Sequence, residues 1–229
     1  SKAWTLAQHP IDKANCSYTL AEIYMRAGDL DEAIDSFRQA LKLLNNGDNG
    51  ANLRLAQCYT QKEDFTNALH FFGQATTTMG HHPDIYLGLG HVNFALERYH
   101  TAIEYYGQAI TRIANSLELS DETKWRANSL CYCGIGAAYY HLEEYQNSWQ
   151  AQRQSHACWP TNPYPLVNLA SLAAHHKNKK AMLEALEKGL PYIIDTYELQ
   201  CGALIGYILS DYNFEPYKDI VLSMLLKHK

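Results

Sequence analysis

The feature that most constrains the fold of this chain is an internal repeat. Four segments of 24 residues align with one another without a gap: 18–41, 53–76, 87–110 and 133–156. Each segment has a small residue at its fourth position and another one twelve positions later. The second small residue recurs after 35, 34 and 46 positions, at Ala33, Ala68, Ala102 and Ser148. Recurrence at this distance is typical of a fold in which similar units stack in a row.

Each segment has the pattern of two helices joined by a short polar turn. The turns lie near 26–29 and 61–64, and in the third segment near Glu97. Large apolar residues follow the turn in every segment: Leu30, Phe65, Tyr99 and Tyr145. Neither helix of a pair can bury its apolar face alone, so the pairs must stack, and the small residues let the helix axes approach closely. The pattern therefore predicts an all-α protein.

The repeat length of 34 and this order of small and aromatic residues resemble the tetratricopeptide-repeat family. The resemblance extends over roughly 14–190. In the first three segments an aromatic residue stands four positions after the second small residue, at Phe37, Phe72 and Tyr106, whereas the fourth segment has Gln152 there. The resemblance implies a right-handed superhelical solenoid of antiparallel helix pairs. Its expected repeats are 14–47, 49–82, 83–119, 120–160 and a degenerate fifth at 163–190.

Three expectations concern the rest of the chain. Residues 1–13 are expected to be the end of a preceding helix or an N-terminal extension, and 191–229 to form capping helices, the last of which starts near Pro216. The fourth repeat carries twelve extra residues around 111–131. Ser120 is a suitable helix N-cap there, and we expect the two flanking helices to lengthen by about one and a half turns each. The turn of the fifth repeat is expected to be one residue shorter than the others.

The resemblance also implies where a partner would bind. In the family, the first helices of the repeats line a concave groove, and a set of positions on each helix points into it. The corresponding residues expected to bind a partner are Tyr18, Glu22, Met25, Arg26, Leu53, Gln57, Leu87, His91, Phe94, Cys133, Tyr140 and His141. The alternative for each ring in this set is packing against a neighbouring helix.

One well-known use of this groove is excluded. The chaperone-binding members of the family hold a C-terminal carboxylate with Lys, Arg and Asn side chains. Those places hold Tyr18, Glu22, Arg54, Asp84 and Gly88 in this chain. The resemblance therefore implies a scaffold or adaptor that binds another type of peptide or helical segment of a partner protein. The alternative is a structural unit that self-associates or forms part of a larger multi-protein assembly.

Composition and motifs argue against other classes of function. The net charge is −5, and the 24 acidic and 19 basic side chains are spread along the chain, so nucleic-acid binding is not expected. No apolar run approaches the roughly 20 residues that cross a bilayer, so membrane insertion is not expected. The six cysteines and the histidines show no CxxC or HExxH spacing. We therefore expect no metal, no cofactor, no enzymatic activity and a cytoplasmic location.

Overall fold

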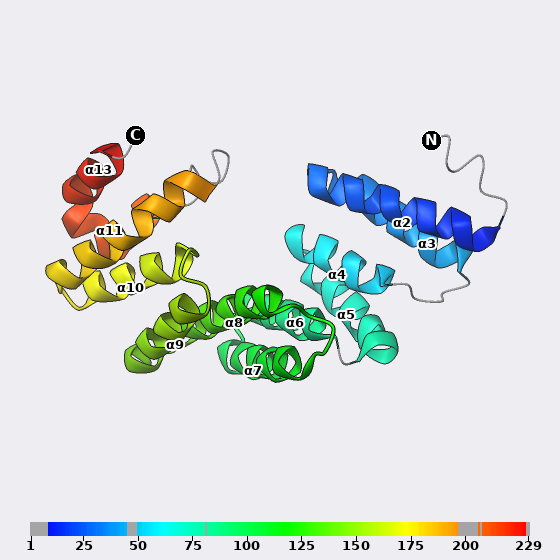
Figure 1. The fold of residues 1–229 in the computed structure, drawn as a ribbon, viewed down its shortest axis with the longest axis horizontal. Helices are drawn as coiled ribbons and strands as arrows, with labels where there is room; N and C mark the ends of the chain where they lie inside the picture. Colours follow the sequence, from blue (N-terminus) through cyan, green and yellow to red (C-terminus); the bar gives the residue numbers. More distant parts are fainter. Residues whose placement is uncertain (1–8, 45–49, 81, 197–205, 207, 228–229) are drawn as a thin grey trace. The chain divides into compact units, whose positions relative to one another are not determined.

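A computed structural model describes residues 9–44, 50–80, 82–196, 206 and 208–227 of the chain. The described residues form helices and no strand (Figure 1). The chain divides into two compact units, Ser1–Arg112 and Ile113–Lys229, each with its own set of packed helices. The all-α solenoid of paired helices is confirmed, and the division between the units falls within the expected third repeat.

The first unit contains three helix pairs. Their helices are α2 (Pro10–Ala27) and α3 (Leu30–Leu43), α4 (Ala51–Gln61) and α5 (Phe65–Met79), and α6 (Pro83–Ala95) and α7 (Tyr99–Asn115), whose last three residues belong to the second unit. Helix α2 packs on α3 and α4 packs on α5. The pairs also stack, because α3 packs on α4, α5 packs on α6, and the first helices α4 and α6 contact each other.

The second unit contains two helix pairs and a C-terminal segment. Its helices are α8 (Asp121–His141) and α9 (Tyr145–Cys158), α10 (Tyr164–His175) and α11 (Lys179–Thr196), the 3-10 helix η1 (Tyr212–Tyr217) and α13 (Lys218–Lys227). Helix α8 packs on α9, α10 packs on both α9 and α11, and η1 packs on α10.

The same turn joins the two helices of every pair. After α6, Glu97 has φ of 59°, its N–H donates to the carbonyl of Phe94 (2.9 Å), and the N–H of Arg98 donates to Asn93 (2.8 Å). This is a Schellman motif, which satisfies the last carbonyls of the helix. Left-handed residues stand at the same place in all five pairs: Gly28, Glu63, Glu97, Glu143 and Lys177. The turn of the fifth pair has the same length as the others, so the expected shortening was wrong.

Small residues allow the close packing that the repeat pattern predicts. Ala102 and Ala109 are fully buried, and Tyr106 between them is 1% exposed. A Cβ atom added to Gly90 would lie 2.5 Å from the ring of Tyr106, so this glycine makes room for the aromatic side chain. In the fourth repeat Gln152 occupies the corresponding place, and its amide donates to the carbonyl of Cys133 (3.1 Å). The missing aromatic residue is thus replaced by a buried hydrogen-bonded amide.

The twelve extra residues of the fourth repeat are not shared equally between the flanking helices. Helix α8 has 21 residues against 13 in α6, whereas α7 has 17 against 15 in α5. The expected lengthening by similar amounts was therefore wrong, because α8 takes up eight of the twelve residues. The predicted N-cap is confirmed, since the Ser120 side chain accepts a hydrogen bond from the N–H of Thr123 (3.3 Å).

The ends of the helices differ from the expected boundaries. Helix α2 begins at Pro10, so the last residues of 1–13 belong to the first repeat. Helix α11 continues through Pro191 to Thr196, so the expected boundary at 190 lies inside a helix. The last α-helix begins at Lys218, after η1, and the expected start at Pro216 was wrong by two residues.

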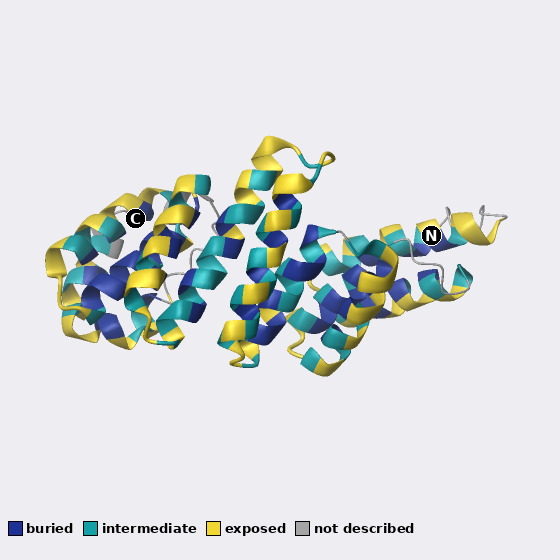
Figure 2. Cartoon of the chain, turned by 90° about the horizontal axis from the view of Figure 1, so that it is seen from below, coloured by how far each residue is buried: buried dark blue, intermediate teal, exposed yellow. Residues whose placement is uncertain are grey.

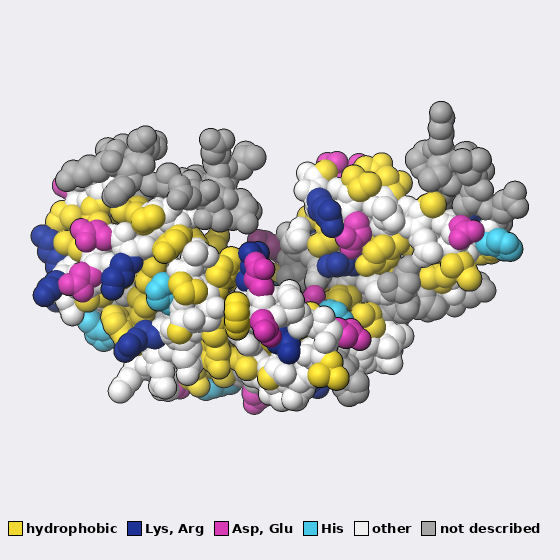
Figure 3. All heavy atoms as spheres, viewed as in Figure 1, with side chains coloured by type: hydrophobic (Ala, Val, Ile, Leu, Met, Phe, Trp, Pro, Cys, Tyr) yellow, Lys and Arg dark blue, Asp and Glu magenta, His cyan; other side chains and the backbone are white. Residues whose placement is uncertain are grey.

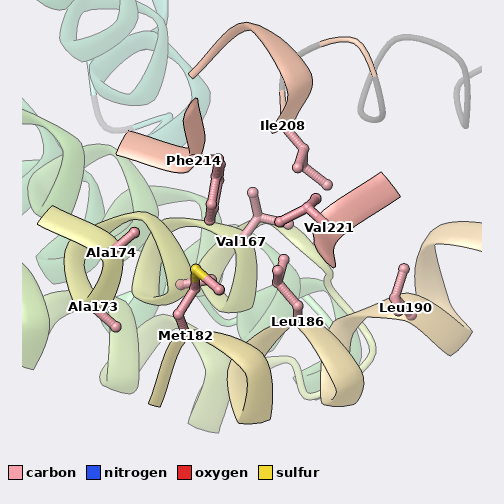
Figure 4. Close-up of a cluster of buried hydrophobic side chains, with 10 residues drawn as sticks. Val167, Ala173, Ala174, Met182, Leu186, Leu190, Ile208, Phe214 and Val221 are labelled. Carbon is pink, nitrogen blue, oxygen red and sulfur yellow. The ribbon is translucent and has the colours of Figure 1, made fainter. Parts of the chain in front are cut away.

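The C-terminal segment closes the core of the second unit. Ile208, Phe214 and Val221 point toward the side chains of α10 and α11, and all are at most 2% exposed (Figure 4). Their neighbours in this cluster are Val167, Ala170, Ala173, Ala174, Met182, Leu186 and Leu190. The segment therefore covers the last helix pair, as the apolar faces of a terminal repeat require.

Candidate partner-binding surfaces

A polar network links the first helices of the first unit. Glu22 on α2 forms an ion pair with Arg54 on α4 (Oε1–Nε 2.8 Å), and Arg54 also donates to Gln57 (2.9 Å). Glu22 contacts Arg26 as well (3.6 Å). The structure thus brings together three residues of the expected set, Glu22, Arg26 and Gln57, around an arginine that the set did not include.

The charge of Arg54 is balanced within this network. Burial by itself lowers the pKa of Arg54, but the hydrogen bond with Tyr18 and the charges of Glu22 on α2 and Asp84 on α6 raise it above its usual value. The guanidinium therefore stays charged, paired with Glu22 and further stabilised by the negative charge of Asp84. A ligand carboxylate would have to compete with both of them, which agrees with the missing carboxylate clamp.

Aromatic and apolar side chains flank the network and are partly buried. Tyr18 packs edge-on against Phe37 (ring centroids 5.2 Å apart), and Phe94 packs in the same way against Tyr99 (5.5 Å). These rings therefore contact their second helices and still expose part of their surface. His91 is exposed and lies edge-on to Tyr106.

The remaining apolar members of the set in this unit differ in exposure. Met25 and Leu87 are half-buried. Leu53 is only 4% exposed and packs in the interior, so we leave it out of the candidate surface. Figure 3 shows acidic, basic and hydrophobic side chains interspersed on the visible face of this unit, without a large area of one charge sign.

The expected partner-binding residues of the second unit are Cys133, Tyr140 and His141. Tyr140 is hydrogen-bonded to the hydroxyl of Tyr212 (3.0 Å) and accepts a hydrogen bond from the Asn213 amide (2.7 Å). Cys133 accepts a weak hydrogen bond from Asn168 (3.4 Å), and burial raises the pKa of its thiol to about 12. His141 is exposed. Tyr140 is thus held by the protein's own C-terminal segment.

This C-terminal contact was not expected from the sequence. Asn213 also donates to Ser171 (2.9 Å), and its side-chain oxygen lies 3.3 Å from Nδ1 of His175. His175 stands 34 positions after His141, so it is the corresponding position of the fifth repeat. The repeat spacing could have located this position. It could not have identified Asn213, which lies 73 residues after Tyr140.

A shallow hollow lies beside the long helix α8. Arg126 places its guanidinium over the ring of Trp159 (5.1 Å to the centroid), and Trp125 is 57% exposed. The shallow hollow there has a volume of about 580 Å³ and is lined by Trp125, Tyr132, Gln154, Ala157, Cys158 and Pro160. The lengthening of α8 therefore adds an apolar surface to the second unit.

Among the described residues, no three His, Cys, Asp and Glu side chains form a group that could hold a metal ion. No helix among the same residues combines the length and apolar character needed to cross a membrane.

Comparisons with known proteins agree with the repeat architecture. Models of the tetratricopeptide repeat match residues 12–79 and 83–116. A comparison with curated proteins finds no match.

Several solved structures are similar to this chain in fold. The structure of the APC/C hetero-tetramer Cut9-Hcn1 is 19% identical with a TM-score of 0.69; the match covers 86% of this chain but 36% of that chain. The type IV pilus biogenesis factor PilW is 18% identical over 93% and 92% of the two chains, with a TM-score of 0.69. YrrB, "a TPR protein with an unusual peptide-binding site", is 19% identical over 79% and 86%, with a TM-score of 0.53.

These identities are low, so the likeness to the solved structures concerns the fold alone. The repeat models, the Schellman turns and the stacked helix pairs agree on the architecture of residues 12–116. The matched residues 12–79 and 83–116 of this chain are tetratricopeptide repeats.

Proposed function

We propose that the protein is a non-enzymatic scaffold or adaptor that binds a peptide or helical segment of another protein along α2, α4 and α6. The observation that carries this proposal is the ion pair between Glu22 and Arg54, which joins two first helices and lies among partly exposed apolar side chains. The proposed contact residues of the first unit are Tyr18, Glu22, Met25, Arg26, Gln57, Leu87, His91 and Phe94.

The chemistry of this surface favours a particular kind of ligand. Arg54 is already paired with Glu22 and lies in the field of Asp84, so the surface has no unbalanced positive charge to attract a terminal carboxylate. Partly buried aromatic side chains supply much of the energy of protein interfaces. We therefore expect a segment with internal apolar side chains, whose free C-terminus makes no essential contact.

The similar structures support the general role. YrrB is described as having an unusual peptide-binding site, and Cut9-Hcn1 is a hetero-tetramer. Tetratricopeptide repeats generally serve as protein-interaction scaffolds. The proposed setting is the cytoplasm, because Cys16, Cys58, Cys131, Cys133 and Cys158 have free thiols.

The experiment selects displayed peptides on the full chain and measures the affinity of a selected peptide by fluorescence anisotropy. Phe94→Ala should weaken binding at least tenfold, since it removes a partly exposed ring from the proposed surface. The matched control is Tyr105→Ala, which removes a half-buried ring from the second helix α7 and should leave the affinity unchanged. Amidation of the peptide's C-terminus should also have no effect. Equal affinity for the wild type and Phe94→Ala would reject this surface.

The second candidate function is that of a structural unit within a larger assembly. The observation that favours it is the exposure of Leu20 (38%) and Ile23 (58%) on α2. Light scattering across the micromolar range tests the self-associating form of this function. A strictly monomeric chain would rule out that form.

A further inference from the structure

The shallow hollow of the second unit lies between the first half of α8 and the end of α9. Trp125 and Tyr132 line it from α8, and Gln154 and Cys158 line it from α9. Trp125 is 57% exposed and Tyr132 is half-buried, and the exposed and half-buried residues along α8 can be followed in Figure 2. The side chains around the hollow are therefore accessible to another molecule.

The third repeat fills the corresponding place with an arginine of its own. In the aligned segments Tyr132 stands 46 positions after Tyr86, and Cys158 stands 46 positions after Arg112. The Arg112 guanidinium lies over the Tyr86 ring, 3.5 Å from its centroid, and donates to the carbonyl of Gln108 (3.3 Å). The short side chain of Cys158 does not extend over Tyr132 in this way. The fourth repeat therefore keeps the ring and lacks the guanidinium that covers it in the third.

We propose that the hollow binds an arginine side chain of a partner protein, whose guanidinium stacks on Tyr132 as that of Arg112 stacks on Tyr86. The hydrogen-bond acceptor is also present, because Gln154 stands at the position of Gln108. A planar guanidinium stacks on an aromatic ring and is more weakly hydrated than an ammonium group, so arginine fits this place better than lysine. The site lies in the second unit and does not depend on the groove of the first.

The charges beside the hollow are compatible with a cation. Arg126 places its guanidinium over the Trp159 ring (5.1 Å to the centroid) and forms an ion pair with Glu122 (2.6 Å), so its own charge is balanced. This pair also shows that an aromatic ring at this end of the unit accepts a guanidinium. Trp125 and Pro160 add apolar surface to the hollow, on which the aliphatic part of an arginine side chain can pack.

The test titrates the full chain, labelled with nitrogen-15, with a capped peptide of sequence Gly-Leu-Arg-Leu-Gly. The backbone amide signals of Gln154, Ala157 and Cys158 should shift saturably. Peptides with lysine or with the uncharged citrulline in place of arginine should bind at least about fivefold more weakly, because they lose the planar cation that stacks on the ring. Equal binding of the three peptides would overturn the inference.

Variants of the chain test where the peptide binds. Cys158→Arg should block binding, because its own guanidinium would then lie over Tyr132 as Arg112 lies over its ring. The matched control Gln146→Arg adds the same charge at an exposed position about 18 Å along α9 and should leave binding unchanged. Tyr132→Leu, which removes the ring but keeps an apolar side chain, should weaken binding at least about fivefold. Circular dichroism checks that the variants are folded.

The groove variant Phe94→Ala separates this inference from the proposed function, because it should leave the binding of the arginine peptide unchanged. Undiminished binding to Cys158→Arg would overturn the inference. So would a loss of binding in Phe94→Ala, since the peptide would then bind in the first unit. Binding that occurs only in Arg126→Ala would show that the chain's own guanidinium enters the hollow, which also overturns it.

Discussion

At the scale of single residues, the packing of the repeats depends on where the chain has glycine, which leaves room for a neighbouring side chain. Gly90 and Gly107 both lie in the third repeat, one on each helix. A Cβ atom on Gly90 would lie 2.5 Å from the Tyr106 ring, whereas one on Gly107 would have no neighbour within 4 Å. The same residue type therefore has a different structural role at each of these two positions.

This difference gives a prediction for stability. Gly90→Ala should destabilise the first unit by about 1–3 kcal/mol, because Tyr106 is buried and has little room to move. Gly107→Ala should be neutral or should stabilise by up to about 1 kcal/mol, since alanine is the better helix former. Urea unfolding followed by circular dichroism measures both. A Gly90→Ala protein as stable as the wild type would contradict the packing described here.

A second prediction concerns the reactivity of Cys133. Burial raises the pKa of this thiol to about 12, so almost none of it is thiolate at pH 8. Iodoacetamide should alkylate Cys133 in the folded protein at least about a hundredfold more slowly than in urea, where an ordinary pKa of about 8.5 applies. Peptide mass spectrometry after timed quenching measures the rate. Similar rates in the two conditions would refute the burial of the thiol.

At the scale of elements, the side chain of Asn213 adds hydrogen bonds to the apolar cluster that packs the C-terminal segment on the last repeats. The Asn213 amide donates to Tyr140 and Ser171, and its oxygen lies close to His175, so it contacts both α8 and α10. The resemblance to the family predicts groove positions at these partners, so the segment η1 contacts residues that were expected to face a ligand.

We expect Asn213→Ala to loosen this segment. The loss of two hydrogen bonds from a residue only 6% exposed should cost about 1–3 kcal/mol. Hydrogen exchange should become faster in α10 and α13 and stay unchanged in α4 and α5. The control is Tyr212→Phe, which removes a hydroxyl from a residue that is 69% exposed and should change exchange little. Unchanged exchange in Asn213→Ala would mean that the apolar cluster alone holds the segment.

At the scale of the whole molecule, the chain consists of two compact units, with a division at Arg112. The helix pairs α2–α3 and α4–α5 and the polar network around Arg54 lie entirely within the first unit. Stability in repeat proteins comes from contacts within a repeat and between neighbours. The first unit therefore contains the packing contacts of its own first helices α2 and α4.

The corresponding prediction is that a fragment of residues 1–116 folds alone. It should be helical and unfold cooperatively, because the packing of α2 on α3, α3 on α4, α4 on α5 and α5 on α6 lies within it. Circular dichroism during heating measures both properties. Peptides selected on the full chain should bind the fragment with similar affinity. A fragment without a cooperative transition would show that the first unit depends on the second.

The repeat, the helix pairs and the N-cap at Ser120 could be predicted from the sequence alone. These features depend on residues close together in the chain, such as Gly90 and Tyr106 or Ser120 and Thr123, so short-range spacing and helix-capping chemistry are sufficient to predict them. The groove positions were implied by the resemblance to the tetratricopeptide-repeat family. The extent of their exposure was not, as the burial of Leu53 shows.

Tertiary packing determines which of the predicted groove positions are accessible to a partner. The ion pair between Glu22 and Arg54 and the contact of Tyr140 with Asn213 join residues that are 32 and 73 positions apart. No local pattern in the sequence encodes such pairs, because they depend on how neighbouring helices stack and where the C-terminal segment returns. Ile23 on α2 is a further case: the corresponding Cys58 of the second repeat is fully buried, and only the packing shows that Ile23 is 58% exposed.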